Sequence, residues 1–205
     1  GVVRKRREAP GEDMISHLVN GDLGDRKLTH EEGRAMSANL VVGGLDTVRN
    51  MMSFIAYYLA QNPEQRRSLV NDPSLIPNAI EELLRWSAVA NMGRSVVGDF
   101  EFHGARMRAG DMVLMPLVLA GRDEAAFPDA AKVDFTREGL RHISFGTGSH
   151  LCPGMHLARI ELRIFLEEWL KRIPDFALDP AQEARTRGGI ILAVESLTLV
   201  WAVSA

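Results

Sequence analysis

Residues 145–154 read FGTGSHLCPG and contain Cys152, the single cysteine in a chain of 205 residues. Three glycines flank this cysteine, at Gly146, Gly148 and Gly154. Glycine tolerates positive φ and lets the backbone approach a flat ligand closely. Pro153 follows the cysteine, and the run HLARIELRIFLEEWL beyond it has helical periodicity. Because proline fits the first position of a helix, the pattern predicts that Cys152 lies at a helix N-terminus.

A cysteine at a helix N-terminus lies where unpaired N–H groups and the helix dipole favour the thiolate form. A lone thiolate on a glycine-rich loop suits the axial ligation of haem iron. Taken by itself, however, a single cysteine is more often a small buried hydrophobic residue. A structural zinc site needs companion ligands, and the chain has no second cysteine.

The full pattern Phe-Gly-x-Gly-x-His-x-Cys-x-Gly resembles the haem-binding loop of the cytochrome P-450 family, the haem-thiolate monooxygenases. By this resemblance Cys152 is the proximal ligand of the iron of haem b, and Phe145 shields its sulfur. Haem carries two propionates, so cations are expected near its edge. The resemblance assigns three residues to them: Arg94, His142 and His150. His142 also suits a turn histidine bonded to backbone.

Residues 43–47 read GGLDT and resemble the oxygen-binding segment of the central helix in the same family. Gly43 and Gly44 would leave room for a diatomic ligand over haem. Oxygen activation needs protons delivered into a dry pocket, and a carboxylate beside a hydroxyl suits such a relay. The resemblance therefore makes Asp46 the relay acid and Thr47 the pocket hydroxyl. On its own, the string is explained equally well by an aspartate paired to a nearby arginine and a packed threonine.

Glu82 and Arg85 form an E-x-x-R pair, whose spacing puts both on one helix face. Glu81 is the poorer match, because its i+3 residue is not an arginine. In the family the pair joins a later arginine, and Arg137 matches that place, so we interpret the three as a structural charge cluster. The resemblance also assigns residues to the substrate pocket, whose alternative is ordinary core: Val89, Ala90, Asn91, Ile190 and Ile191.

Capping and periodicity predict one long helix over 29–62, ending before Pro63. Its middle is apolar on most sides, as in a helix buried inside a larger protein, and its two glycines imply a kink, a close ligand or tight packing. Before it we expect a helix end, a short helix to about residue 19 and a turn-rich segment over 20–27. After it we expect helices over 63–70 and 76–86, a small antiparallel sheet over 96–115, a meander over 116–140, the helix after Cys152 to about 172, and a final hairpin of 190–193 with 198–202.

This order resembles the C-terminal half of a cytochrome P-450 over essentially all 205 residues. The expected fold is mainly α-helical with small antiparallel β-sheets. We expect residues 1–205 to be the C-terminal portion of a single domain whose N-terminal half is absent. The first residue, Gly1, is not a methionine, which favours a fragment or a processed form.

The composition, 46% hydrophobic and 25% charged with a formal net charge of −3, is that of one soluble globular domain and gives no argument for nucleic acid. The late apolar stretch IILAVESLTLVW is interrupted by Glu195, so no run is long enough to cross a bilayer. One cysteine forms no internal disulfide, which fits a reducing cytosol. We expect a cytoplasmic protein without nucleic-acid or membrane partners.

The strings VVGGLDTV, EELLRW and RIPDF are similar to the soluble bacterial class that includes camphor hydroxylases. Those enzymes take electrons, ultimately from NAD(P)H, through a reductase and a two-iron ferredoxin. Arg159 and Arg163 suit contact with an acidic ferredoxin, and a solvated helix face explains them as well. The leading interpretation is a monooxygenase that inserts an atom of dioxygen into a C–H bond of a small apolar substrate, terpenoids among the candidates. The alternatives are a peroxide-using haem-thiolate enzyme, and an orphan or chimeric half-domain without independent activity.

Overall fold

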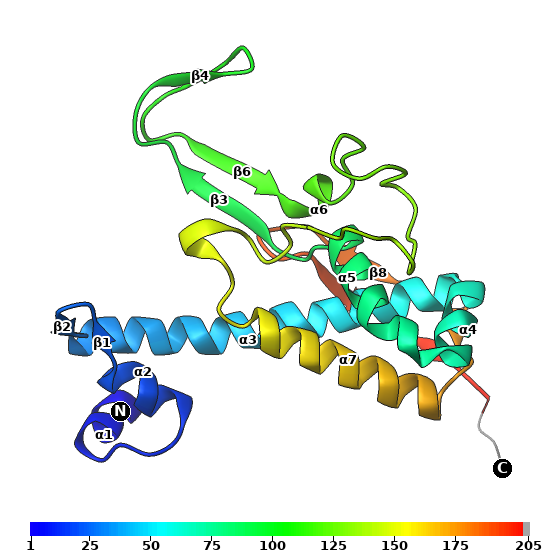
Figure 1. The fold of residues 1–205 in the computed structure, drawn as a ribbon, viewed down its shortest axis with the longest axis horizontal. Coiled ribbons are helices and arrows are strands. Elements are labelled where there is room, and N and C mark those ends of the chain that lie inside the picture. Colours follow the sequence, from blue (N-terminus) through cyan, green and yellow to red (C-terminus); the bar gives the residue numbers. More distant parts are fainter. Residues whose placement is uncertain (203–205) are drawn as a thin grey trace. The chain divides into compact units, whose positions relative to one another are not determined.

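The computed structural model describes residues 1–202 and confirms a fold of helices and small antiparallel sheets (Figure 1). The chain divides into two compact units, Gly1–Asp46 and Thr47–Ala205. None of the helices within residues 1–202 combines the length and the apolar character that a membrane span requires.

The first unit starts with α1 (Val2–Glu8), where the end of a helix was predicted, followed by the predicted short helix, α2 (Met14–Asn20). The Asp13 carboxylate caps α2 by accepting a hydrogen bond from the N–H of Ser16 (3.0 Å). The segment predicted only as turns contains two paired strands, β1 (Asp22–Leu23) and β2 (Arg26–Lys27). Strands of two residues are too short to show an alternating pattern, which is why composition indicated turns alone.

Helix α3 (His30–Gln61) agrees with the long helix predicted over 29–62. Its capping box forms as predicted, because the Thr29 N–H donates to the Glu32 carboxylate (2.8 Å) and the Glu32 N–H donates to the Thr29 hydroxyl (3.2 Å). The helix ends before Pro63, since proline disrupts a helix interior. The helix continues through Gly43 and Gly44 without a break.

The core of the second unit is shared by four helices: the C-terminal part of α3, α4 (Pro63–Asn71), α5 (Ile76–Trp86) and α7 (Met155–Arg172). The short helix η1 (Pro73–Leu75) joins α4 to α5, and α7 contacts both of them (Figure 1). Each helix contributes buried aliphatic side chains, including Ile55, Leu59, Leu69, Leu83, Leu162 and Leu166. Burying one such side chain stabilises the fold by about 1.5–3 kcal/mol. This packing fixes α5 against α7, on whose N-terminal side the cysteine loop lies.

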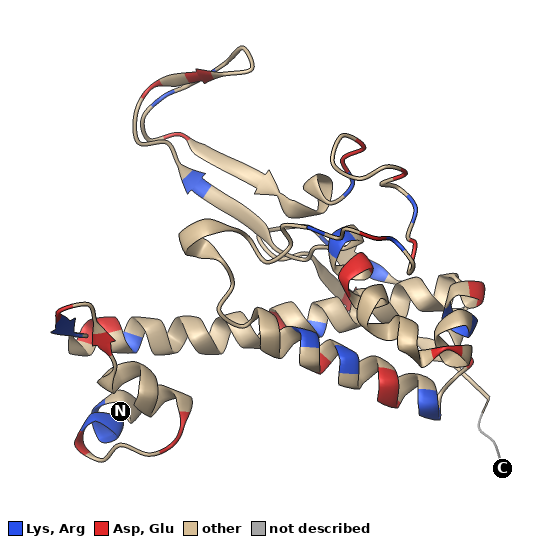
Figure 2. Cartoon of the chain, in the orientation of Figure 1, with Lys and Arg blue, Asp and Glu red and all other residues tan. Residues whose placement is uncertain are grey.

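Helix α7 carries charges of both signs along its length (Figure 2). Two of its ion pairs have helical i,i+4 spacing, Arg163 with Glu167 (3.0 Å) and Arg172 with Glu168. The helix also leaves three aliphatic side chains more than half exposed, at Leu157, Ile160 and Ile164. The buried face of α7 is therefore a narrow stripe of residues that packs against α4 and α5.

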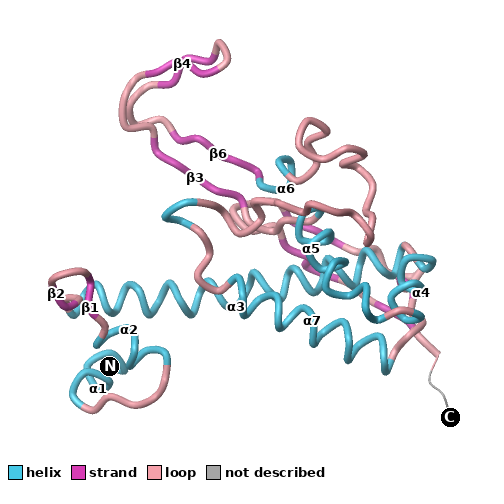
Figure 3. Tube along the Cα trace, viewed as in Figure 1, coloured by secondary structure: helices cyan, strands magenta, loops and turns pink. Residues whose placement is uncertain are grey.

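The strands between α5 and α6 (Leu117–Ala120) form two separate two-stranded sheets (Figure 3). Strand β3 (Asn91–Ser95) pairs antiparallel with β6 (Met112–Pro116), and β4 (Phe100–Phe102) pairs with β5 (Ala105–Met107). The prediction of a single sheet over 96–115 is wrong in two respects: the first strand starts earlier, at Asn91, and the strands form two sheets instead of one. The turn at His103 and Gly104 has positive φ at both residues (49° and 81°), so β4 and β5 fold back on each other and leave β3 to β6. A helical turn, α6, and an irregular meander follow, as predicted.

The predicted final hairpin of 190–193 with 198–202 is wrong. Strand β9 (Ala193–Ser196) pairs with β8 (Arg185–Arg187), and β10 (Leu199–Val200) pairs with β7 (Ala177–Leu178). Leu199 lies opposite Leu178 in the second pair, and both pack against the helical core. This burial gives the last strand a better partner than its neighbour in sequence.

Candidate functional site

The loop that carries Cys152 is closed by its own backbone. The Cys152 N–H donates to the carbonyl of Phe145 (2.9 Å), and the Gly146 N–H donates to the carbonyl of Ile143 (2.8 Å). Gly146 and Gly148 have φ of 74° and 63°, so both use the left-handed region that favours glycine. A Cβ on Gly146 would also lie 3.1 Å from the carbonyl oxygen of His150. The turn is tight enough to require glycine, and it presents a free, half-buried thiol.

Cys152 lies two residues before the N-cap of the following helix, so the prediction that Pro153 is the first helical residue is wrong. Helix α7 begins at Met155 with Gly154 as its N-cap, so Pro153 is not its first residue. The Cys152 carbonyl accepts a hydrogen bond from the Met155 N–H (3.3 Å), which forms a turn before the helix. The helix dipole acts mainly within the first turn. Loop geometry, more than the helix end, therefore presents the sulfur.

A second group of charged residues lies behind this loop. The Glu81 carboxylate of α5 accepts two hydrogen bonds from Arg159 of α7 (Nε 2.6 Å, Nη2 2.8 Å). Its Oε2 also lies 3.2 Å from Nε2 of His142, and the His142 Nδ1 accepts a hydrogen bond from the Ser144 N–H (3.3 Å). The Arg159 guanidinium lies over the Phe145 ring, 4.7 Å from its centroid. Burial alone would raise the pKa of Glu81, but the hydrogen bonds from Arg159 and His142 lower that pKa to about 2.

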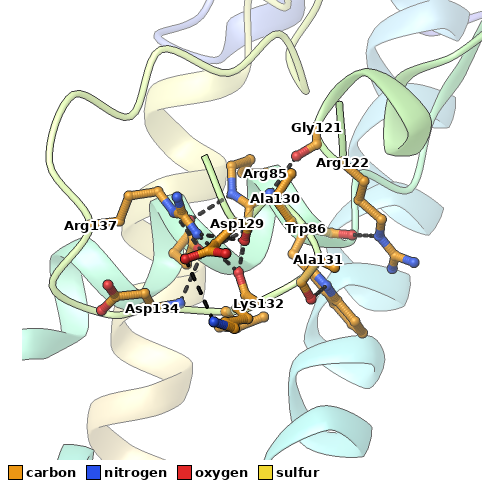
Figure 4. A network of polar contacts seen from close by, with 12 residues as sticks. Arg85, Trp86, Gly121, Arg122, Asp129, Ala130, Ala131, Lys132, Asp134 and Arg137 are labelled. Carbon is orange, nitrogen blue, oxygen red and sulfur yellow. Dashed lines mark hydrogen bonds and ion pairs between the residues drawn. The ribbon is translucent and has the colours of Figure 1, made fainter. Parts of the chain in front are cut away.

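The structure brings together the three residues of the predicted charge cluster, Glu82, Arg85 and Arg137. Figure 4 shows the two arginines. The side chains of Glu82 and Arg85 are fully buried, and Arg85 binds both Glu82 oxygens (Nε 2.7 Å, Nη2 2.6 Å). Arg137 adds a third contact, from its Nε to Glu82 Oε1 (3.1 Å). A buried carboxylate destabilises a fold unless its charge is paired and its oxygens are hydrogen-bonded, and both conditions hold here.

Arg85 and Arg137 also bind the backbone of the meander, as Figure 4 shows. Arg85 donates to the carbonyls of Gly121, Ala130 and Lys132, and Glu82 accepts the N–H of Asp134 (2.9 Å). The irregular segment before the cysteine loop is thus attached to α5 by charge-assisted hydrogen bonds instead of regular secondary structure.

Arg94 and His150 lie on different elements. Arg94 is in β3, opposite Val113, and its Nη1 donates to the carbonyl of Gly93 (2.8 Å). Within residues 1–202 no carboxylate lies at ion-pair distance from Arg94, so its charge is available for an anion. His150 is the exposed last residue of the short helix η2 (Gly148–His150).

The five residues assigned to the substrate pocket lie together, although about a hundred positions separate the two segments in sequence. The Asn91 N–H donates to the Ile190 carbonyl (2.8 Å), and the Val89 carbonyl accepts the N–H of Leu192 (2.7 Å). Ala90 and Ile191 form an isolated antiparallel bridge between these bonds. The side chain of Asn91 also donates to the carbonyl of Gly189 (2.6 Å). Pairing thus joins the end of α5 to the connection between β8 and β9.

The GGLDT residues lie in the middle of α3. Gly43, Gly44 and Asp46 are exposed and Thr47 is half-buried. A Cβ added to either glycine would meet no described atom within 4 Å. Asp46 ends the first compact unit and Thr47 begins the second. The oxygen-binding role of these four residues stays a prediction from the resemblance.

The contact between Glu81 and Arg159 was not predicted from the sequence. There Glu81 is only the poorer match to the E-x-x-R pair, and Arg159 suits contact with a ferredoxin or a solvated helix face. A signal was present, because two adjacent glutamates on a mostly buried helix point to different faces and each needs a cation.

Residues 68–186, more than half of the chain, match the family model described as Cytochrome P450. The chain belongs to the cytochrome P450 family, as its cysteine loop indicated. Membership of this family implies a haem cofactor.

The chain is 39% identical over 197 residues to a probable cytochrome P450 127A1 of Sinorhizobium fredii, covering 96% of this chain and 48% of the relative. It is 36% identical to a steroid C26-monooxygenase of Mycolicibacterium smegmatis, covering 100% and 51%. Among solved structures it is similar to CYP101J2, with a TM-score of 0.92 and 42% identity, covering 98% of this chain and 51% of that one. The chain spans about half the length of the relatives it matches.

The residues present fit haem. The loop supplies one free, half-buried thiol, and haem iron held by cysteine needs only one such protein ligand. Two positive-φ glycines keep the loop thin beside that sulfur. Arg94 supplies a cation without a carboxylate partner among the described residues.

Proposed function

We propose that this chain forms the haem-holding part of a haem-thiolate monooxygenase. The observation that carries the proposal is the closed loop of residues 145–152, in which the Cys152 amide is bonded to Phe145 and the thiol is left free. When bound, haem supplies an iron centre that activates dioxygen for insertion into a C–H bond. Cys152 holds that iron as a thiolate, and Phe145 shields the sulfur from water.

The positioning of haem falls to cations around the loop. Arg94 and His150 bind the propionates, since guanidinium and imidazole groups make charge-assisted hydrogen bonds to carboxylates. The absence of a carboxylate partner for Arg94 within residues 1–202 supports this assignment. His142 was predicted at the same edge, but its ring already contacts Glu81 and the Ser144 N–H.

Proton delivery is assigned to α3. Asp46 passes a proton from solvent toward the pocket, and the Thr47 hydroxyl holds the water that receives it. The exposure of Asp46 and the half-buried position of Thr47 support this order, because the acid must reach solvent and the hydroxyl must reach the pocket. Gly43 and Gly44, which lack side chains, leave space beside the helix for dioxygen.

The substrate is a small, mostly apolar molecule, and terpenoids remain candidates. The pocket includes residues 89–91 and 190–191, whose side chains are mostly aliphatic. The related steroid C26-monooxygenase acts, by its name, on a steroid, which agrees with this class. We assign the electrons to NAD(P)H through a two-iron ferredoxin and place the enzyme in the cytoplasm. We also expect activity to require an N-terminal half of the same fold.

The test uses a full-length enzyme that contains this chain, with ferredoxin, reductase and a panel of terpenoid and steroid substrates under ¹⁸O₂. We expect a product carrying one labelled oxygen atom and dependent on NAD(P)H, and no product from Cys152→Ser. Product formed from peroxide alone, with no gain from the electron donors, would contradict the monooxygenase assignment and indicate a peroxide-using enzyme.

A further inference from the structure

We propose that Glu81, Arg159 and His142 form a positioning cluster that holds the cysteine loop against α5 and α7. The three residues come from three elements: Glu81 from α5, His142 from the segment before the loop, and Arg159 from the second turn of α7. The carboxylate lies at the centre and contacts both the Arg159 guanidinium (2.6 and 2.8 Å) and the His142 ring (3.2 Å). It therefore ties together the two ends of the segment that contains Cys152.

The contacts lead from this cluster to the cysteine in two steps. The Arg159 guanidinium covers the Phe145 ring at 4.7 Å, and the His142 ring lies 6.2 Å from the same ring. The Phe145 carbonyl in turn accepts the Cys152 N–H at 2.9 Å. Any movement of Phe145 therefore moves the acceptor that orients the backbone of the cysteine. Ser144 adds a second attachment, because its hydroxyl donates to the Leu84 carbonyl of α5 (2.8 Å).

Arg159 is used internally rather than presented to a partner. Two of its nitrogens bind Glu81, its Cζ lies 4.7 Å from the centroid of the Phe145 ring, and its side chain is 33% exposed. Arg163, one turn further along α7, makes a single contact with Glu167 (3.0 Å), and these side chains are 59% and 41% exposed. A bidentate, partly buried pair is much stronger than an exposed helical pair, so Arg163 provides a matched control on the same helix.

Both ring nitrogens of His142 have protein partners, and its side chain is 2% exposed. In this proposal His142 supports the loop from behind and does not bind a haem propionate, which replaces the role predicted for it from the family resemblance.

The experiment measures how well Cys152 is held in the haem-free full-length enzyme. Labelling of Cys152 by a thiol reagent, followed by peptide mass spectrometry, is compared for wild type, Arg159→Gln, Glu81→Gln and the control Arg163→Gln. Loss of a charge-assisted pair should raise the Cys152 labelling rate about tenfold in the first two variants, while the control changes by less than about twofold. Rates equal to that of the control would overturn the proposal. Glu81→Gln keeps the side-chain shape and decides the matter if Arg159→Gln does not fold.

The second readout is spectroscopic and rests on the proposed function. In the haem-loaded enzyme, the fraction of the ferrous–CO complex with the thiolate band should fall in Arg159→Gln and be partly restored in Arg159→Lys, which keeps the charge but not the bidentate geometry. A full thiolate band in both variants, together with an unchanged Cys152 labelling rate, would contradict the proposal that the cluster positions the cysteine loop. A wild-type enzyme without that band would instead reject the proposed function, and the labelling rates would still decide whether the cluster positions Cys152.

Discussion

Cys152 is held by backbone hydrogen bonds and by glycines that no other residue replaces easily. This part of the site could be predicted from the sequence. The positive φ angles in the loop require glycine, and glycines spaced closely around a cysteine are visible as a local sequence pattern. The start of α7 could not, since Pro153 suits a turn before a helix as well as its first position. The partner of Glu81 could not be predicted either, because Arg159 is 78 positions away in sequence and only packing brings the two together.

The proton relay predicts different effects for two neighbouring substitutions in α3. Thr47→Ala should leave haem binding and reductant consumption largely intact but divert electrons to hydrogen peroxide, because water in the pocket loses its hydroxyl partner. Asp46→Asn should slow turnover as a whole, by about 10²–10⁴-fold, because the relay loses its acid. Product formed per NAD(P)H consumed, with peroxide assayed in parallel, measures both effects. Wild-type coupling in Thr47→Ala would mean that residues 43–47 serve packing alone.

The carboxylate of Glu81 gives a pH prediction. Its folded pKa, about 2, lies below the ordinary value of 4.5, so its contacts stabilise the fold fully above pH 4.5 and lose this effect as the pH falls toward 2. Wild type should therefore exceed Glu81→Gln in free energy of unfolding by a constant amount above pH 4.5, and the difference should shrink below it. Urea unfolding of the full-length proteins across this range measures the difference. A difference that does not change with pH would show that the charge of Glu81 contributes nothing.

At the scale of elements, the E-x-x-R residues fasten the meander to α5. Replacing Arg85 with leucine leaves the fully buried Glu82 carboxylate without its bidentate partner and frees the Gly121 and Ala130 carbonyls. Arg85→Leu should lower the free energy of unfolding of the full-length enzyme by about 3–5 kcal/mol. The exposed control Arg163→Leu should lower it by less than about 1 kcal/mol. Chemical denaturation measures both, and equal losses would mean that the cluster is no more than a surface ion pair.

The helices were predicted closely and the strands poorly, for a physical reason. Helix α5 occupies the predicted range 76–86, because its signals are local: a proline near the start and periodic apolar residues. Strand partners are set by contacts between residues far apart in sequence, as when β10 pairs with β7 instead of with β9. The same limit applied to β3, whose start at Asn91 depends on its register with β6.

At the scale of the whole molecule, the second unit exposes apolar side chains along α7. Leu157, Ile160 and Ile164 lie at helical spacing on α7 and are 52%, 55% and 53% exposed. Such a stripe favours association through the hydrophobic effect. We expect the 205-residue polypeptide alone to self-associate or to take up haem weakly, as measured by sedimentation and by haem titration. A monomeric, cooperatively unfolding and haem-replete preparation would refute this expectation.

The central claim is that Cys152 holds haem iron as a thiolate, and the ferrous–CO spectrum of the full-length enzyme tests it most directly. Wild type should show the red-shifted band that gives the family its name, because thiolate ligation produces it. Cys152→Ser, compared at matched haem content, should lose that band. An unchanged CO spectrum in Cys152→Ser would contradict the account, because the iron would then have a different protein ligand.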